Sequence, residues 1–405
     1  MIIKAILFLF IIILAETYIV KRVTKAFRLI FNIKNLTKFK RIRRLLLFYF
    51  NLYPIIMIIL IITFLFSGNK EFTNPANALF DWLIVYPFWV SLVILLQSAV
   101  LVLLVDLITL VFKLFSFDKG KLLKMGYKII LIIFTIFLFY VPAQVIYDYN
   151  TTEVSRVTYE KDNLPNSLKG FKIALIADIQ ADYYTDTKRL EKYIKKVQNE
   201  KPDLILIAGD MITSSPNYIK LAGKELGKLS APYGVFACVG DHDNWAYRRD
   251  MPRSLREVKA SLQHNGIPML DNQNVIIPVD SSKILLTAIT NTYVSQVSDT
   301  ILDSLTNYNS DLDLKIFFVH QPRKRLVNIA VKRNYDLYLC GHTHGGQIVM
   351  LFPFANIMMS KLESRFTRGK YLVNKMMVYV NRGLGMSIAP IRYNAEPEIT
   401  IIKLN

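Results

Sequence analysis

The stretch from Leu337 to Gln347 reads Leu-Tyr-Leu-Cys-Gly-His-Thr-His-Gly-Gly-Gln and decides how this chain is interpreted. Its first four residues are apolar and too few to form a helix, so they predict a short buried strand. Gly341 allows a sharp turn after that strand, and His342 and His344 follow at once. Imidazole nitrogens presented at the end of a buried strand are suitable ligands for a divalent metal ion.

Five apolar runs earlier in the chain have the same character. Each is short and rich in Ile, Leu and Val, as in the buried strands of an α/β sheet; they cover residues 173–177, 204–208, 235–239, 284–288 and 316–319. Amphipathic helices are expected at 188–198 and 326–332. Four of the runs lead within two residues into Asp178, Asp210, Asp241 and His320. The ends of the predicted strands therefore carry the carboxylates and imidazoles that a metal cluster needs.

These blocks occur in the order D-x-Q, G-D, G-D-H-D, H and G-H-x-H. The order resembles the calcineurin-like metallophosphoesterase superfamily, whose pattern is D-x-H, G-D, G-N-H-D or G-N-H-E, H and G-H-x-H. The resemblance extends over about residues 164–402. It is similar in detail to the bacterial membrane-associated or exported branch, through Leu164-Pro165, Leu168-Lys169-Gly170-Phe171, the residues 341–347, Asn381-Arg382-Gly383-Leu384-Gly385 and Pro397-Glu398-Ile399.

The resemblance implies an α/β fold, a four-layer αββα sandwich in which two mixed β-sheets are flanked by helices. It also implies a site for two divalent metal ions, where a metal-bridging hydroxide hydrolyses a phosphodiester, a pyrophosphate or a phosphomonoester. One metal would be held by Asp178, Gln180, Asp210 and His344. The other would be held by Asp210, Asp241, His320 and His342, with Asp210 as the bridge.

Two further roles come from the same resemblance. His242 would protonate or stabilise the leaving group, and Asp243 would orient its ring. Arg382 and Arg392 are candidates for binding the phosphate of the substrate. Pairing of these two arginines with groups of the protein itself is an equal alternative.

The chain departs from the family pattern at two ligand positions. Gln180 stands where the family usually has His, and Asp241 stands where it usually has Asn. Gln180 replaces an imidazole with a neutral carbonyl oxygen, and Asp241 replaces a neutral carbonyl with a carboxylate. The site is therefore richer in oxygen and one charge more negative, which favours Mn²⁺ or Mg²⁺, with Zn²⁺ or iron as the alternatives. A degenerate site in a metal-binding membrane receptor or scaffold is the second hypothesis. The presence of His242 as a free acid favours an active enzyme.

Residues 1–150 are predicted to be an all-α transmembrane region, because they contain long apolar runs. About four helices are expected, at 5–20, 45–66, 82–112 and 128–146. Residues 151–166 are predicted to be a linker, and residues 167–405 the metallophosphoesterase domain. A cleaved signal peptide is the alternative for the first run. Only Lys4 precedes its apolar core, however, and Ile13-Leu14-Ala15 is a poor cleavage site.

Basic residues predict the orientation in the membrane. Residues 21–44 contain ten Lys or Arg and no acid, and residues 113–128 contain five Lys and one Asp. Such loops stay on the cytoplasmic side, which predicts an integral protein of the bacterial cytoplasmic membrane with its catalytic domain on the extracytoplasmic side.

The net charge of +19 does not indicate nucleic acid as a partner. Residues 1–150 carry 17 basic and 6 acidic side chains, a surplus of 11, and these belong beside anionic lipid headgroups. The expected partners are therefore the lipid bilayer and a phosphorylated small-molecule or lipid substrate. No nucleic acid is expected, and the oligomeric state is left open.

Overall fold

The computed structural model describes residues 2–67, 77–115, 118–308, 312–352 and 354–405. The chain divides into two compact units, an N-terminal helical unit that ends at Tyr147 and a C-terminal unit that begins at Asp148.

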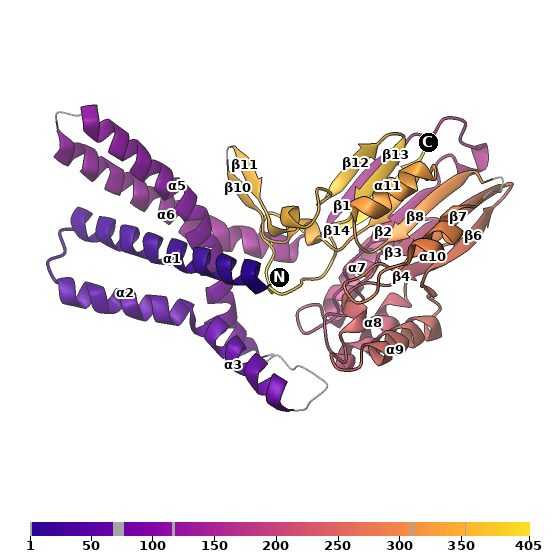
Figure 1. Cartoon of the computed structure of the whole chain (residues 1–405), viewed down its shortest axis with the longest axis horizontal. Helices are drawn as coiled ribbons and strands as arrows, with labels where there is room; N and C mark the ends of the chain where they lie inside the picture. The colour runs from indigo at the N-terminus through magenta and orange to yellow at the C-terminus, as the bar shows by residue number, and fades with distance from the viewer. Residues whose placement is uncertain (1, 68–76, 116–117, 309–311, 353) are drawn as a thin grey trace. The chain divides into compact units, whose positions relative to one another are not determined.

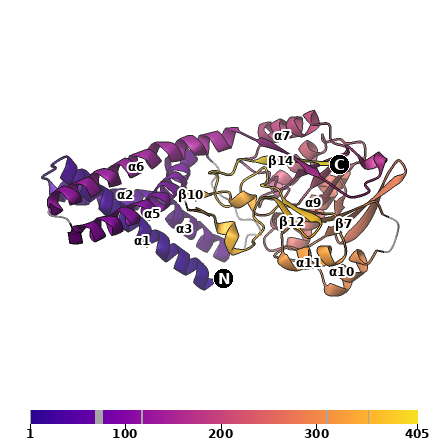
Figure 2. The same cartoon turned by 90° about the horizontal axis from the view of Figure 1, so that it is seen from above.

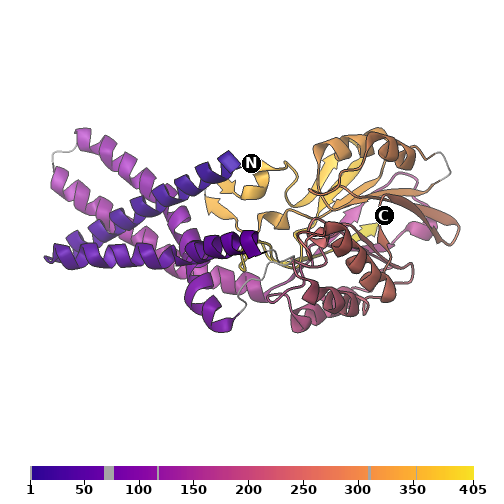
Figure 3. The same ribbon diagram turned by 60° about the horizontal axis from the view of Figure 1, so that its bottom comes forward.

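The N-terminal unit consists of helices throughout its described part (Figure 3). Their bounds are α1 (Ile2–Ile30), α2 (Leu36–Phe50), α3 (Leu52–Ser67), α4 (Ala78–Phe80), the π-helical turn η1 (Asp81–Val85), α5 (Tyr86–Phe115) and α6 (Lys119–Asn150). α1 and α5 pack through apolar residues that include Ile19 and Val102. Asp106 on α5 accepts a hydrogen bond of 2.6 Å from Tyr18 Oη and pairs with Arg22. A carboxylate within an apolar helix is thus matched by polar groups of its neighbour.

Residues 5–20, 82–112 and 128–146 are helical as predicted, whereas the predicted helix 45–66 is divided at Asn51 between α2 and α3. Two helical stretches are long and apolar enough to cross a bilayer, residues 78–115 and 119–150. α2 and α3, which are bent by 41° relative to each other, form a third if they act as one span. The predicted helix 5–20 lies within α1, which continues through a basic segment as far as Ile30. The number of spans therefore remains a prediction.

The C-terminal unit contains two six-stranded sheets and a separate hairpin (Figure 1). The first sheet has the order β1-β14-β2-β3-β4-β5, the second has the order β12-β13-β9-β8-β7-β6, and β10 and β11 form the hairpin. The strands are β1 (Glu153–Tyr159), β2 (Lys172–Ile176), β3 (Leu204–Ile207), β4 (Val235–Cys238), β5 (Met269–Leu270), β6 (Gln273–Val279), β7 (Ser282–Ile289), β8 (Leu314–Val319), β9 (Leu337–Cys340), β10 (Met350–Phe352), β11 (Ala355–Ile357), β12 (Gly369–Val373), β13 (Met376–Val380) and β14 (Glu398–Leu404). Both large sheets are mixed, because β14 runs antiparallel to β2, and β12 and β6 run antiparallel to their neighbours.

Five helices cover the outer faces of the two sheets. They are α7 (Thr187–Asn199), α8 (Ile219–Leu226) and α9 (Met251–His264) on the first sheet, and α10 (Asp299–Thr306) and α11 (Lys324–Lys332) on the second. Figure 2 shows α7 on one side of the strands and α10 and α11 on the other. The predicted four-layer αββα sandwich is therefore confirmed.

Each central strand contributes to two cores, because successive side chains point to opposite faces. On β3, Ile205 and Ile207 pack under the helices, while Leu206 packs in the core between the sheets. On β8, Phe317 faces the helices and Phe318 faces the other sheet. This double burial is why these strands read as continuous apolar runs in the sequence.

The predicted linker at residues 151–166 differs from the structure. Residues 153–159 form β1, which pairs in parallel with β14 along its whole length. β1 lies at the edge of the sheet, so most of its side chains are exposed or half-buried, and only Tyr159 is buried. An edge strand of this kind has the polar composition of a linker, so its sequence pattern predicts a linker and not a strand.

Candidate active site

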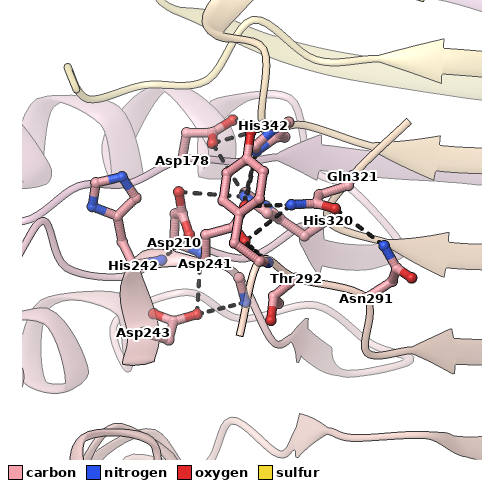
Figure 4. Close-up of polar contacts among 12 residues, drawn as sticks. Asp178, Asp210, Asp241, His242, Asp243, Asn291, Thr292, His320, Gln321 and His342 are labelled. Atoms are coloured by element: carbon pink, nitrogen blue, oxygen red, sulfur yellow. Dashed lines mark hydrogen bonds and ion pairs between the residues drawn. The ribbon is translucent and has the colours of Figure 1, made fainter. Parts of the chain in front are cut away.

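The candidate ligands follow strands whose carboxyl ends meet at one place. β2, β3 and β4 are parallel neighbours in the first sheet, and β8 and β9 are parallel neighbours in the second. Parallel strands end at the same sheet edge, so the loops after them converge. Figure 4 shows the side chains of Asp178, Asp210 and Asp241 close to those of His320 and His342.

Many of these residues have a backbone conformation that L-amino acids rarely adopt. The left-handed φ angles are 48° at Asp178, 49° at Gln180, 59° at Asp210, 75° at His342 and 49° at His344. Each such residue costs roughly 1–3 kcal/mol and persists only where neighbouring bonds hold it. Gln180 N donates to Asp210 O at 2.9 Å, and Gly385 N donates to Asp178 O at 2.7 Å. Concentrated strain of this kind is characteristic of functional sites.

Glycines before two of the ligands allow the loops to approach closely. A Cβ atom on Gly240 would lie 2.2 Å from the amide nitrogen of Asp210. A Cβ atom on Gly341 would lie 2.6 Å from Oδ2 of Asp178. Neither position has space for a side chain, so glycine is required for the loops to meet.

Asp178, Asp210 and His320 form one group of possible metal ligands. His320 Nε2 lies 3.3 Å from Asp210 Oδ2 and 4.0 Å from Asp178 Oδ1. His344 Nε2 lies 3.5 Å from Asp178 Oδ1, and Gln180 Nε2 donates to Asp210 Oδ2 at 2.9 Å. All five side chains are buried. The four residues predicted for the first metal are thus brought together, with His320 beside them.

Asp241, His320 and His342 form a second group. Asp241 Oδ2 lies 3.4 Å from His320 Nε2 and 3.0 Å from His342 Nδ1. The ring nitrogens His342 Nδ1 and His320 Nε2 are 3.3 Å apart. Because His320 belongs to both groups, the two candidate metal positions are adjacent.

Two buried polar atoms at the site have no hydrogen-bond partner among the described residues, Oε1 of Gln180 and Nδ1 of His344. Leaving a buried polar atom unpaired costs about 1–3 kcal/mol. Both atoms carry lone pairs and belong to residues predicted to bind the first metal, so the donor set fits a divalent cation.

The electrostatics of the site also fit a cation. Burial raises the pKa of Asp178 to about 7. Burial disfavours the charged form of His320 too, but Asp210, Asp241 and Asp178 outweigh it and hold the pKa of His320 well above its usual value. Burial likewise opposes ionisation of Asp241, yet His320 and His342 hold its pKa well below the usual range. The carboxylates thus stabilise the protonated, positively charged form of the histidine beside them, and they would stabilise a metal cation in the same way.

The chain is similar in sequence to known proteins. Residues 171–346 match the family model of the calcineurin-like phosphoesterases. The uncharacterized metallophosphoesterase YkuE of Bacillus subtilis is 31% identical over 255 residues, which are 62% of this chain and 85% of the relative. The chain belongs to the calcineurin-like phosphoesterase family. It is therefore a metallophosphoesterase, a hydrolase of phosphoester bonds in a class with dinuclear metal sites.

Two other bacterial relatives match a similar part of this metallophosphoesterase. The uncharacterized metallophosphoesterase Cj0846 of Campylobacter jejuni is 30% identical over 287 residues, which are 70% of this chain and 71% of the relative. The UDP-2,3-diacylglucosamine pyrophosphatase LpxG of Chlamydia muridarum is 29% identical over 303 residues, which are 63% of this chain and 89% of the relative.

His242 lies beside the metal ligands of this metallophosphoesterase, but Asp243 does not orient it. His242 Nδ1 lies 2.5 Å from the carbonyl oxygen of Thr213, and Nε2 lies 3.2 Å from Ser387 Oγ. The carboxylate of Asp243 instead accepts backbone N–H bonds at 2.8 Å from both Gly240 and Met211. Asp243 therefore holds the ligand loops together. The His242 ring, which Asp243 was predicted to orient, is instead held by the backbone carbonyl of Thr213.

Arg382 and Arg392 are engaged with the protein itself. The Arg382 guanidinium pairs with three carboxylates, those of Glu153, Glu396 and Glu398. Arg392 is fully buried, and its N–H groups donate to backbone carbonyl oxygens of residues 382, 383, 385, 344 and 395. Burial lowers the pKa of Arg392 to about 10. These contacts brace the loop against Asp178, so the predicted phosphate contact has no geometric support.

The structure adds residues around Asp241 that were not predicted. Gln321 Nε2 donates to both carboxylate oxygens of Asp241, at 2.8 and 3.0 Å, and Tyr293 N donates at 2.6 Å. Asn291 holds the other end of the Gln321 amide (Figure 4). Glu363 Oε1 lies 3.1 Å from His342 Nε2. Gln321 directly follows the predicted ligand His320, so its position in the sequence indicates that it lies near the site. Asn291, Tyr293 and Glu363 lie in loops far from the predicted ligands in sequence, and no motif marks them.

Replacing His320 with Ala is expected to abolish tight metal binding, because this imidazole belongs to both ligand groups. Metal per protein, measured by mass spectrometry after equilibration with Mn²⁺ and desalting, should fall by more than half. The matched control is His264→Ala, since His264 is an exposed histidine at the end of α9. Equal metal content in a folded His320→Ala protein would contradict the assignment.

Proposed function

We propose that this protein is a membrane-anchored phosphoesterase that acts at a two-metal site on a phosphodiester, pyrophosphate or phosphomonoester linked to lipid or to the cell envelope. The observation that carries the proposal is the convergence of Asp178, Asp210, Asp241, His320 and His342, whose ligand atoms form two overlapping groups. Gln180 and His344 complete the first group through their unpaired buried atoms.

In this proposal each residue has a separate task. Two divalent metals held by these residues would supply a hydroxide nucleophile and charge neutralisation for the phosphoryl group. Asp210 belongs to the first group and lies 3.3 Å from His320, the residue that both groups share, so it is the candidate for bridging the two metals. Gln321 and Tyr293 N hold the Asp241 carboxylate in one orientation. The backbone amides bound by Asp243 fix the loop that carries Asp241 and His242.

We assign His242 to the leaving group. With Nδ1 bound to the Thr213 carbonyl, the proton of the neutral ring lies on Nδ1, and Nε2 is left to face Ser387. Burial lowers the pKa of His242, and the nearby Asp210 partly offsets the effect. To protonate a departing oxygen, Nε2 must first take up a proton, which gives the imidazolium form of His242. A ring whose pKa is lowered holds this second proton weakly and transfers it readily to the leaving oxygen.

The membrane context supports a lipid- or envelope-linked substrate. At least two helical stretches have the length and apolarity to cross a bilayer, and they tether the domain close to phospholipid and envelope phosphates. LpxG, one of the relatives, is named for pyrophosphate hydrolysis on a diacylated sugar nucleotide.

Replacing His242 with Ala is expected to lower kcat by about 10²–10⁴-fold, the usual contribution of a general acid. KM and metal content should change little, since His242 is not a predicted ligand. The measurement is hydrolysis of bis(p-nitrophenyl) phosphate by detergent-solubilised protein with added Mn²⁺, Mg²⁺ or Zn²⁺. His264→Ala serves as the control and should retain full activity. Metal binding without turnover in any of these metals would refute the enzyme and support a metal-binding receptor.

We further propose that the site prefers Mn²⁺ or Mg²⁺. Gln180 offers a carbonyl oxygen where the family usually has an imidazole, and Asp241 offers a charged carboxylate where it usually has a neutral amide oxygen. Hard cations favour oxygen ligands, and charged ones most.

Replacing Gln180 with His should shift the ratio of Zn²⁺ to Mn²⁺ affinity toward zinc by on the order of ten-fold. Competition titrations with a metal-sensitive chelator measure the ratio. Gln198→His on α7, remote from the ligands in sequence, is the control. An unchanged ratio would mean that Gln180 is not a ligand.

We propose that the domain lies on the extracytoplasmic side, because the lysines at the end of α5 and in the first turns of α6, within residues 113–128, belong on the cytoplasmic side. Alkaline phosphatase fused after Asn405 should then be active, and green fluorescent protein fused there should be dark. Green fluorescent protein fused after Lys121 should be bright and serves as the control. A bright fusion after Asn405 would reverse the orientation.

A further inference from the structure

The β10–β11 hairpin stands apart from both six-stranded sheets (Figure 1). Its base is fixed to the domain, where Val349 and Met358 are buried against Ala395. A two-stranded hairpin is marginally stable in water without a packed face. β11 is exposed along its whole length, and in β10 Leu351 is exposed while Phe352 is buried, so most of the hairpin surface is not covered by the domain.

Four large apolar side chains project from the hairpin and from the turn η6 (Met359–Leu362) that follows it. Their exposed fractions are 65% for Phe354, 42% for Ile357, 51% for Met359 and 82% for Leu362. We call these four residues the hairpin patch. Apolar side chains gathered on a short segment of a domain surface mark a site of interaction with a partner or a membrane.

The charges beside the hairpin patch are positive. Lys361 lies within η6, Arg365 lies four residues after Lys361, and both are exposed. Glu363 is the one acid in the sequence from 350 to 370, and it is already paired with Arg323 and His342. Exposed apolar side chains flanked by cations are the combination that binds the interfacial layer of an anionic bilayer.

The hairpin patch is directly connected to the active site. Leu362 precedes Glu363, whose carboxylate contacts the ligand His342. On the other side of the site, Ile388 is 87% exposed and follows Ser387, which contacts His242. Ile388 has a φ of 65°, a strained conformation for a β-branched residue. Exposed apolar side chains therefore flank the metal ligands on two sides.

We propose that the hairpin patch inserts into the headgroup and upper acyl region of an anionic lipid bilayer and holds the active site against that surface. The chain has helices able to cross a membrane, so a bilayer lies within reach of the domain at all times. The cations select phosphate-bearing headgroups, and the apolar side chains leave water. Docking does not require catalysis; the consequence that the substrate is a phosphorylated lipid rests on the proposed function.

The test uses the full chain in lipid nanodiscs that hold one copy each. Leu362→Cys and, as a control, Lys332→Cys at the exposed end of α11 are labelled with an environment-sensitive fluorophore. The unmodified protein reports background labelling, since both of its cysteines are buried. Phosphatidylcholine discs with and without phosphatidylglycerol are compared, each with and without a lipid that carries a quencher on its acyl chain.

The label at 362 should be blue-shifted and should lose most of its emission to the quencher, more so with phosphatidylglycerol, while the label at 332 is unaffected. Phe354→Asp with Ile357→Asp should remove this quenching. Equal behaviour at 362 and 332 would overturn the proposal. A shielded label that the lipid quencher does not reach would also overturn it, and would indicate the chain's own helices as the occupant.

Activity distinguishes this proposal from the proposed function. The Phe354→Asp, Ile357→Asp protein should hydrolyse bis(p-nitrophenyl) phosphate at the normal rate and lose several-fold in rate on a phospholipid presented in the disc. If the unmodified protein hydrolyses neither compound, the proposed function fails, and the fluorescence result still decides whether the hairpin patch docks.

Discussion

The structure depends on the need to keep three buried carboxylates together. Asp178, Asp210 and Asp241 lie within a few ångströms of His320, where water is largely excluded and like charges repel strongly. Such a cluster is stable only with positive charge among it. His320 and His342 supply part of that charge, and divalent metals are the natural source of the rest. The left-handed turns and the close loop contacts keep the carboxylates in place against their mutual repulsion.

The sequence was sufficient to predict the strands and the order of the ligands, because both are local. A short apolar run followed by glycine and a carboxylate identifies a strand end without knowledge of its neighbours. Leu337–Cys340 forms β9 as predicted, and the ligands after β2, β3, β4 and β8 converge. Features that depend on distant neighbours could not be predicted. The role of Thr213 beside His242, the burial of Arg392 and the pairing of β1 with β14 are all of this kind.

The departure at Asp241 has a structural counterpart. A carboxylate in place of a neutral amide adds a negative charge to a buried site, which is costly unless donors meet it. Gln321 provides its amide and Tyr293 provides its backbone N–H, so both oxygens of Asp241 are satisfied. The change at one ligand therefore comes with a matched second layer of polar groups. The negative charge of Asp241 is therefore compensated within the domain by the groups that surround it.

The place of β14 in the first sheet has a consequence for how the enzyme is made. β14 lies between β1 and β2, and its first residue, Glu398, binds Arg382 in the loop that supports Asp178. Until residues 398–404 emerge from the ribosome, β1 has no neighbour and the edge of β2 is open. Open edges attract other strands, and non-local pairing is slow. The nascent domain therefore passes through a stage in which the edge of β2 is open to pairing with other strands, and Arg382 lacks its Glu398 partner until the last strand is made.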